Sequence, residues 1–329
     1  MSIDAITNIK QILNQELANI DSIITNYLTS EEEVISLISH YLIEPSGKRI
    51  RPILTIIVSK MFGYNGNDNI KLASAIEMIH AATLLHDDVI DASEMRRFKA
   101  TSNIIWGNKL SILVGDFLLS KAFALAIDTN SISSLRILSK STVKIAEGEI
   151  FQLAKLNERK ILKIDEYEKI ILSKTAELFG TSCEIGAILA GEPDSSCETL
   201  KNFGLYLGAI FQISDDSFDY FSNKNEIGKN IGKDFLEGIV TLPLIFLYDK
   251  VAVEEKTMII DMIQAKTRSI NDFELVCALL NKHKIQQEIT NYLLIIKSKA
   301  NKLLAYIQIE NIYKTHLISL LEFAMHRYY

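Results

Sequence analysis

Two acidic motifs, each set in an apolar helical run, constrain the structure of this chain more than any other feature. The first is L-L-H-D-D-V-I-D at positions 84–91, and the second is Q-I-S-D-D-S-F-D at positions 212–219. Both contain the pattern D-D-x-x-D. Because residues four apart share one face of a helix, each motif projects its carboxylates together. The six carboxylates belong to Asp87, Asp88, Asp91, Asp215, Asp216 and Asp219.

Carboxylates clustered on one helix face repel one another, and an unpaired buried charge is costly. A bound cation removes both penalties. Hard oxygen ligands at this density favour Mg²⁺, which completes its coordination shell with water and substrate phosphates. One such motif alone is more often a solvated helix face. Two copies, each preceded by apolar residues, favour a metal-binding function.

The rest of the sequence predicts an all-α fold. The chain has 329 residues, 48% of them hydrophobic, but only 4 Pro and 14 Gly, which are few for an all-β protein with many turns. No linker, repeat or low-complexity tract divides it, so we expect a single domain over 1–329. Apolar periodicity predicts helices over 3–28, 30–42, 52–62, 70–92, 108–127, 131–156, 165–189 and 195–219, a loop over 224–232, and further helices from about 245.

Composition also excludes several classes of protein. A net charge of −6 argues against a general nucleic-acid binder. The three cysteines, Cys183, Cys197 and Cys277, fit no zinc, redox or disulfide pattern, so we expect reduced thiols. We find no signal peptide, and no uninterrupted apolar run reaches the roughly 18 residues of a membrane span. These features predict a cytoplasmic protein without a transmembrane segment.

Cationic side chains recur close to the acidic motifs. Lys48, Arg49 and Arg51 precede the helix that Pro52 begins, and a helix N-terminus suits a phosphate. Arg96 and Arg97 follow the first motif. Lys174 lies in a largely apolar helix, where its ammonium group is poorly placed to be a simply solvated surface charge. For the loop residues the alternative is a set of solvated cations that balance the aspartates.

Glu77 and His80 form an E-x-x-H pattern on the helix that leads to the first acidic motif. Di-iron carboxylate bundles need two such patterns, and this chain has no second copy. The pattern therefore argues against a di-iron site. His80 remains either a binding residue or a hydrogen-bonded core histidine, and we interpret His86 as structural.

Four further motifs complete an ordered series: G-K-R-I-R-P at 47–52, M-R-R at 95–97, S-K-T-A-E-L-F at 173–179 and T-L-P-L at 241–244. With the two acidic motifs, this series resembles the trans-isoprenyl diphosphate synthases, or polyprenyl synthetases, over about 40–250. The likeness is greatest to long-chain bacterial members of the octaprenyl diphosphate synthase type. The resemblance implies an isoprenoid-synthase-type helical bundle around a central cavity, usually as a homodimer.

The resemblance also implies an activity, which is the Mg²⁺-dependent sequential condensation of isopentenyl diphosphate onto an allylic diphosphate such as farnesyl diphosphate. Three Mg²⁺ ions per active site, replaceable by Mn²⁺, would bind the six aspartates. Matching positions that would bind isopentenyl diphosphate are Lys48, Arg51, His80 and Arg97. Those that would bind the allylic diphosphate are Arg96, Lys174 and Lys229. Thr175 and Gln212 are further substrate-binding positions, and Asp234 is a further acidic group near the metals.

The expected product is an octaprenyl (C40) chain, for a quinone side chain in a membrane to which the enzyme is peripheral. Ala82 and Thr83, one turn before Asp87, are small where short-chain members commonly have an aromatic residue. We therefore expect an open path for a growing tail, with Phe117 and Phe123 at its floor.

One position departs from the family pattern. Ile239 stands where the pattern E-G-K-x-T-L-P-L has a lysine, which removes a cation unless Lys233 replaces it. Two alternatives therefore stay open: an inactive or regulatory prenyl-binding subunit of a heteromeric synthase, and a terpene cyclase of the same fold. Retention of all six aspartates and of the G-K-R-x-R-P motif favours chain elongation.

Overall fold

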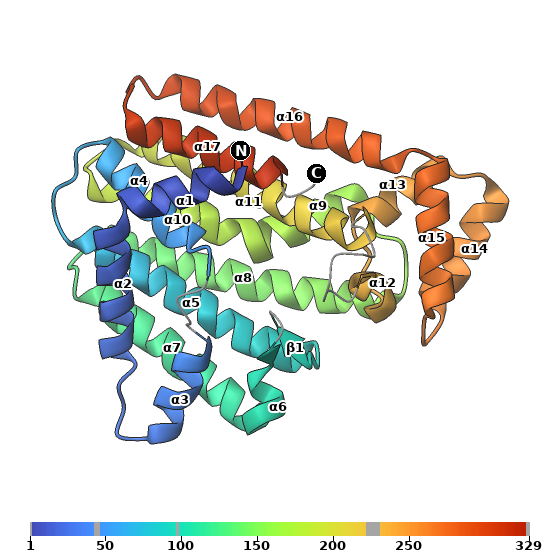
Figure 1. Cartoon of the computed structure of the whole chain (residues 1–329), viewed down its shortest axis with the longest axis horizontal. Coiled ribbons are helices and arrows are strands. Elements are labelled where there is room, and N and C mark those ends of the chain that lie inside the picture. Colours follow the sequence, from blue (N-terminus) through green and yellow to red (C-terminus); the bar gives the residue numbers. More distant parts are fainter. Residues whose placement is uncertain (1, 43–46, 97–98, 222–230, 327–329) are drawn as a thin grey trace. The chain divides into compact units, whose positions relative to one another are not determined.

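The computed structural model describes residues 2–42, 47–96, 99–221 and 231–326. In these ranges every regular element is a helix except one β-ribbon, which confirms the predicted all-α class (Figure 1). The ribbon pairs β1 (Met95–Arg96) antiparallel to β2 (Lys99–Ala100), with Met95 opposite Ala100. By its internal contacts the chain divides into two compact units, which are described separately.

The first unit comprises Met1–Thr142, Leu178–Lys201 and Ile307–Ser319. Its elements are α1 (Ser2–Ile12), α2 (Asn14–Tyr27), α3 (Glu33–Leu42), α4 (Ile50–Met61), α5 (Asp68–Ile90), β1, β2, α6 (Ser102–Trp106) and α7 (Asn108–Ile127), with parts of α8 (Ile132–Glu158), α10 (Glu177–Leu189), α11 (Asp194–Phe221) and α17 (Ile312–His326).

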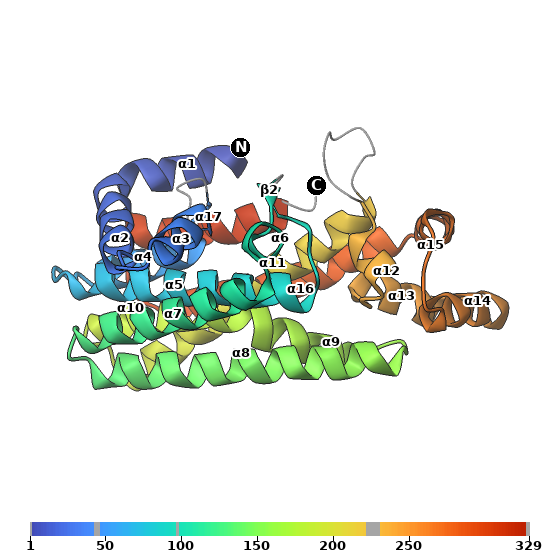
Figure 2. The same ribbon diagram turned by 90° about the horizontal axis from the view of Figure 1, so that it is seen from below.

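Helix α5 is the core of the first unit. Its buried residues lie on all of its faces, as expected for a helix that is enclosed by others. Helix α7 runs beside it, and α2 and α4 also pack against it (Figures 1 and 2). The first acidic motif ends this helix, so its position is fixed by the packing of the core.

The predicted helix over 3–28 is wrong in one respect, because it breaks at Leu13 into α1 and α2, which point in different directions (Figure 2). Ile9 and Leu13 are buried, as are Ile20 and Ile24 beyond the break. The apolar residues keep their helical spacing across the bend, because both helices bury their apolar side. Periodicity alone therefore does not reveal the break. Helix α4 begins at Ile50, two residues before the predicted start at Pro52. Pro52 still lies in the first turn, where a missing N–H breaks no intrahelical bond.

The second unit comprises Val143–Glu177, Asn202–Tyr306 and Leu320–Tyr329. Helix α13 packs against α9, α15 and α16, and α12 packs against α15. The complete elements of this unit are α9 (Ile164–Ile171), a π-helical turn η1 (Leu172–Ala176), α12 (Lys233–Glu237), α13 (Leu242–Lys250), α14 (Val253–Gln264), α15 (Ile270–Lys282) and α16 (Ile285–Tyr306).

The helix predicted over 165–189 is thus three elements, α9, η1 and α10. Helices α8, α10, α11 and α17 each contribute residues to both units. The single domain over 1–329 stays a prediction.

By length and composition, α7 is able to cross a membrane, with a mean hydropathy of 1.9 over its most apolar window. In that window 39% of the residues are buried in the structure. A core helix passes the same test, so this property is weak evidence for a membrane span.

Candidate active site

The first acidic motif lies at the C-terminal end of α5. Asp87 and Asp88 occupy its last turn, and Asp91 is the residue that caps it. Because α5 is enclosed, the Asp88 side chain is only 1% exposed, whereas Asp91 is exposed and Asp87 is intermediate. The three carboxylates look equivalent in the sequence but differ in their exposure to solvent in the structure.

Arg96 neutralises the buried carboxylate of this motif. Its Nε and Nη2 atoms donate to Asp88 Oδ1 at 2.9 and 2.8 Å. The β-ribbon brings this guanidinium back over the end of α5, so two predicted site residues are in contact. A buried charge with a well-aligned partner avoids most of the cost of an unpaired one. Arg97 lies outside the described residues.

His86 links α5 to α7. Its Nε2 atom lies 3.2 Å from the carbonyl oxygen of Ile112 and 3.4 Å from Asp116 Oδ1. A side chain at Gly115 would place its Cβ 2.3 Å from the same nitrogen, so glycine leaves the space that the ring occupies. This arrangement gives His86 a packing role, as expected.

The cations of the G-K-R-I-R-P motif surround the start of α4. Lys48 is exposed, and the Arg51 guanidinium carbon lies 4.7 Å from the centre of the buried Phe179 ring. His80 is half-buried on α5, which packs against α4. Arg49, between the two cations, is buried and forms ion pairs with Asp21 and Glu77.

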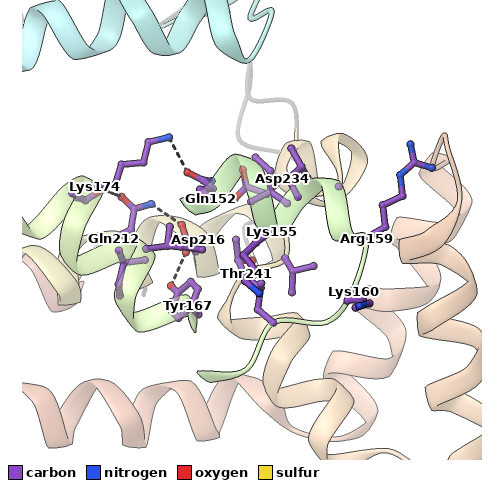
Figure 3. A pocket seen from close by; sticks show the side chains of 18 residues that line it. Gln152, Lys155, Arg159, Lys160, Tyr167, Lys174, Gln212, Asp216, Asp234 and Thr241 are labelled. Atoms are coloured by element: carbon purple, nitrogen blue, oxygen red, sulfur yellow. Dashed lines mark hydrogen bonds between the residues drawn. The ribbon is translucent and has the colours of Figure 1, made fainter. Parts of the chain in front are cut away.

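The second acidic motif, on α11 in the second unit, is held by hydrogen bonds (Figure 3). Asp216, 5% exposed, accepts from Tyr167 Oη at 2.6 Å and from Gln212 Nε2 at 2.7 Å. Gln212 Oε1 in turn accepts from Thr175 Oγ1 at 2.7 Å. Both Asp216 oxygens are thereby oriented, and the chain of hydrogen bonds brings Thr175 and Gln212 to the aspartate.

Lys174 lies on the π-helical turn η1, next to Thr175. Its Nζ donates to Gln152 Oε1 at 2.9 Å and pairs with Glu149 Oε2 at 2.5 Å. Single π turns inside α-helices are frequent at functional sites, because the extra residue changes the direction of nearby side chains. Here the turn carries Lys174 and Thr175, the two predicted site residues of this helix.

Asp219 has a different environment from Asp216. Its Oδ1 accepts from the backbone N–H of Gly232 at 3.0 Å and of Lys233 at 3.2 Å, and its Oδ2 from that of Asp234 at 3.0 Å. The carboxylate therefore anchors the start of α12. Asp215 is partly exposed. Lys229 lies outside the described residues.

A pocket of about 160 Å³ opens beside Asp216 within the second unit. At one end in the view of Figure 3 lie Lys174 and Gln212, and at the other Arg159 and Lys160. Further lining residues are Gln152, Lys155, Tyr167, Ile170, Ile171, Thr175, Asp234, Ile239, Val240 and Thr241. The pocket thus combines carboxylates, cations and an apolar wall.

Burial and mutual repulsion shift the acidic groups of this pocket. Burial raises the pKa of Asp216 to about 7, although the hydrogen bonds from Tyr167 and Gln212 oppose the shift. Burial and the charges of Asp216 and Asp219 raise the pKa of Asp234 well above its usual range. Burial also raises the pKa of Asp219, against the hydrogen bonds of the α12 backbone. Such a cluster ionises readily only when a cation is nearby.

Comparison with known proteins identifies the family. A model described as Polyprenyl synthetase matches residues 32–280. The chain belongs to the polyprenyl synthetase family. This confirms the resemblance drawn from the motifs and makes the chain a prenyltransferase by family.

Individual relatives of this polyprenyl synthetase match its sequence or its fold over most of its length. It is 39% identical over 251 residues to the octaprenyl diphosphate synthase of Escherichia coli (strain K12), covering 76% of this chain and 77% of that one. It is 39% identical over 260 residues to the all-trans-nonaprenyl-diphosphate synthase (geranyl-diphosphate specific) of Rhodobacter capsulatus, covering 79% of each. The polyprenyl synthase of Caulobacter crescentus CB15, complexed with calcium and isoprenyl diphosphate, superposes with a TM-score of 0.91 at 35% identity and 97% coverage of each chain.

The residues of the second unit fit a divalent cation. Among the described residues, no three carboxylate, imidazole or thiol groups already surround one point. Mg²⁺ is usually held by one or two carboxylates and completes its shell with waters and substrate phosphates, so a complete protein cage is not required. Burial first, and neighbouring carboxylates second, raise the pKa values of Asp216 and Asp234, so a cation beside them would favour their ionised forms.

Sequence reasoning missed several partners of the predicted residues. Tyr167 binds Asp216, and Glu149 and Gln152 bind Lys174. Lys155 lines the same pocket as Ile239 and forms ion pairs with Glu158 and Glu166. A lone tyrosine or glutamate carries no motif signal. Only the position of Tyr167, two helical turns before Lys174, places it on the appropriate face.

Proposed function

We propose that the chain is a long-chain trans-polyprenyl diphosphate synthase that adds isopentenyl diphosphate units to an allylic diphosphate, with an octaprenyl (C40) product. The observation that carries this proposal is the pocket around Asp216, where oriented, buried carboxylates lie beside Lys174, Thr175 and Gln212. Carboxylates next to cations suit a diphosphate that shares metal ions with the protein.

In this proposal both acidic motifs, which belong to different units, act on one diphosphate. Mg²⁺, three ions per site and replaceable by Mn²⁺, would supply the charge that stabilises the leaving diphosphate. The carboxylates for these ions would be Asp87, Asp88, Asp91, Asp215, Asp216 and Asp219.

In this proposal the cations divide between two substrates. Arg96, Lys174 and Lys229 donate to the departing allylic diphosphate, whose C–O bond breaks to leave an allylic carbocation. Lys48, Arg51, His80 and Arg97 hold the diphosphate of isopentenyl diphosphate, whose double bond attacks that cation. The departing diphosphate takes the proton that is lost. Ile170, Ile171 and Val240 on the pocket wall exclude water from the reacting cation.

A long product is supported by the helix that precedes Asp87. Ala82 is 2% exposed and Thr83 is half-buried, and neither narrows the space as an aromatic side chain would. Phe117 and Phe123 on the adjacent α7 are half-buried and suit the floor of a hydrocarbon path.

The proposal extends to assembly and location. Exposed apolar side chains on α6 and α7, among them Ile104, Ile105, Ile112 and Leu113, suit the interface of a homodimer. We place the enzyme in the cytoplasm, peripheral to the membrane that receives a quinone side chain.

The alternative is an inactive subunit of a heteromer, and Ile239 is the observation that favours it. Ile239 lines the pocket where the family pattern has a lysine, and Lys233 is turned to Glu237 at 3.6 Å. Lys155, Arg159 and Lys160 line the same pocket and are the cations available to compensate.

Incubating the purified chain with Mg²⁺, farnesyl diphosphate and labelled isopentenyl diphosphate tests the proposal. We expect a product series that ends at the octaprenyl chain. No incorporation by a folded chain would support the inactive-subunit alternative, and a cyclised hydrocarbon would support a terpene cyclase.

A further inference from the structure

Arg49 adopts an unusual backbone conformation between two proposed substrate-binding cations. Its φ angle is +56°, in the left-handed region that non-glycine residues rarely adopt. It immediately precedes α4, with Lys48 on one side and Arg51 two residues beyond. A strained conformation of this kind persists only where the surrounding structure holds it, and such positions cluster at ligand-binding sites.

Two carboxylates from different helices hold Arg49. Its Nη1 atom donates to Glu77 Oε1 on α5 at 2.8 Å, and its Nη2 atom donates to Asp21 Oδ1 on α2 at 2.9 Å. The Arg49 side chain is 6% exposed, and that of Glu77 is 13% exposed. A buried guanidinium shared between two carboxylates in a fixed geometry orders the backbone that carries it.

A third contact fixes the turn from α1. Lys10 Nζ donates to the carbonyl oxygen of Gly47 at 2.8 Å, one residue before Lys48. Burial and the charge of Arg49 lower the pKa of Lys10, whereas Asp21 and Glu77 oppose this shift. Charged side chains of α1, α2 and α5 therefore meet at residues 47–49, directly before α4.

We infer that Asp21, Glu77 and Lys10 are positioning residues for the isopentenyl diphosphate site, because they hold Arg49 and Gly47 in the turn that sets Lys48 and Arg51 in register. The inference rests on the proposed function of those two cations. It also gives a role to the E-x-x-H pattern: Glu77 binds Arg49, and His80, three residues later, lies on the same side of α5 as this turn. The N-terminal helices α1 and α2 thereby become part of the substrate site.

Substitution of the two carboxylates tests this role. In Asp21→Asn and Glu77→Gln, we expect the KM for isopentenyl diphosphate to rise about tenfold, the effect of losing one charged hydrogen bond. The KM for farnesyl diphosphate and kcat stay within about twofold of wild type, because the turn carries no group for the allylic substrate.

Glu16→Gln is the matched control. Glu16 on α2 pairs with Lys60 on α4 at 2.5 Å, so it joins the same two helices at the other end of α4. If Asp21 acts only by attaching α2 to the rest of the unit, Glu16→Gln and Asp21→Asn will raise the KM for isopentenyl diphosphate equally. That result overturns the inference. The thermal midpoint of each variant separates a folding defect from a binding defect.

A pair of substitutions at residue 49 tests whether its backbone conformation is what matters. Glycine adopts the left-handed region without a steric penalty, whereas alanine does not. We expect Arg49→Gly to bind isopentenyl diphosphate more tightly than Arg49→Ala. Equal KM values in these two variants, with no effect of Asp21→Asn, would assign Arg49 a direct contact with substrate and overturn the inference.

Failure of the inference is distinguishable from failure of the proposed function. A wild-type chain that transfers no prenyl groups overturns the function. A wild-type chain that does so, with the same KM for isopentenyl diphosphate in Asp21→Asn as in wild type, overturns only the role of the turn.

Discussion

The hydroxyl of Tyr167 offers a sharp test of how the pocket controls its carboxylate. It donates to the buried Oδ2 of Asp216 at 2.6 Å, the length of a strong hydrogen bond to an ionised acceptor. Tyr167→Phe removes this donor with almost no change in shape. We expect the variant to fold normally and to need more Mg²⁺ for prenyl transfer.

The magnitude follows from the pKa of Asp216. A hydrogen bond to a charged group contributes about 1.5–3 kcal/mol, which corresponds to a rise of about one to two pKa units. Starting from a pKa of about 7, this rise leaves Asp216 mostly protonated at neutral pH. The Mg²⁺ concentration at half-maximal rate should therefore increase about tenfold near pH 7.5, and the difference should shrink as the pH is raised.

The assay is a Mg²⁺ titration of prenyl transfer at two pH values, with calorimetric Mg²⁺ binding as a second readout. Tyr292→Phe is the matched control, because Tyr292 donates to Glu168, the residue after Tyr167, and does not line the pocket. An unchanged Mg²⁺ dependence in Tyr167→Phe, or an equal change in Tyr292→Phe, would refute the reasoning.

Three further predictions concern the first motif, the product and the pH dependence. Asp87→Ala should lower turnover at least about 10²-fold, the scale of one strong electrostatic contact, and a rate near that of wild type would remove Asp87 from the metal site. Ala82→Phe should shorten the longest product seen on a sizing gel. Thr83→Phe should do the same, and because Thr83 is less buried, its effect on product length would not come from overpacking of the core. Because the folded-state pKa of Asp216 lies above its ordinary value, the metal-free chain loses stability as the pH rises from about 4 to 7. Its thermal midpoint in chelator should fall between pH 5 and 8, and Mg²⁺ with diphosphate should raise it more at pH 8 than at pH 6.

The helices were predictable where apolar periodicity is long and uninterrupted. The predicted helix over 108–127 coincides with α7, and those over 70–92 and 131–156 agree within two residues. The break at Leu13 was not predictable, because its apolar spacing continues through the bend. The π turn at Leu172–Ala176 has no glycine or proline to mark it, and the two-residue strands β1 and β2 are too short for a pattern.

The candidate site was predictable where its residues belong to motifs with a chemical reason for their spacing. The aspartates were proposed from their spacing and Lys174 from its apolar surroundings, whereas Gln212 followed from the family resemblance; their roles stay predictions. The different exposure of the aspartates was not predictable from the sequence, because only packing buries Asp88 and Asp216 and leaves Asp91 exposed. Tyr167 and the partners of Arg49 come from distant parts of the sequence and carry no local signal, so they required the fold.

The claim that both acidic motifs serve one diphosphate is tested most directly by locating the metal ions. Crystals grown with Mn²⁺ and the unreactive thiolo analogue of farnesyl diphosphate would reveal the ions by anomalous scattering. We predict Mn²⁺ bound by carboxylates of the first motif and of the second, with the diphosphate between them. Ions at only one motif, or a diphosphate bound away from both, would contradict it.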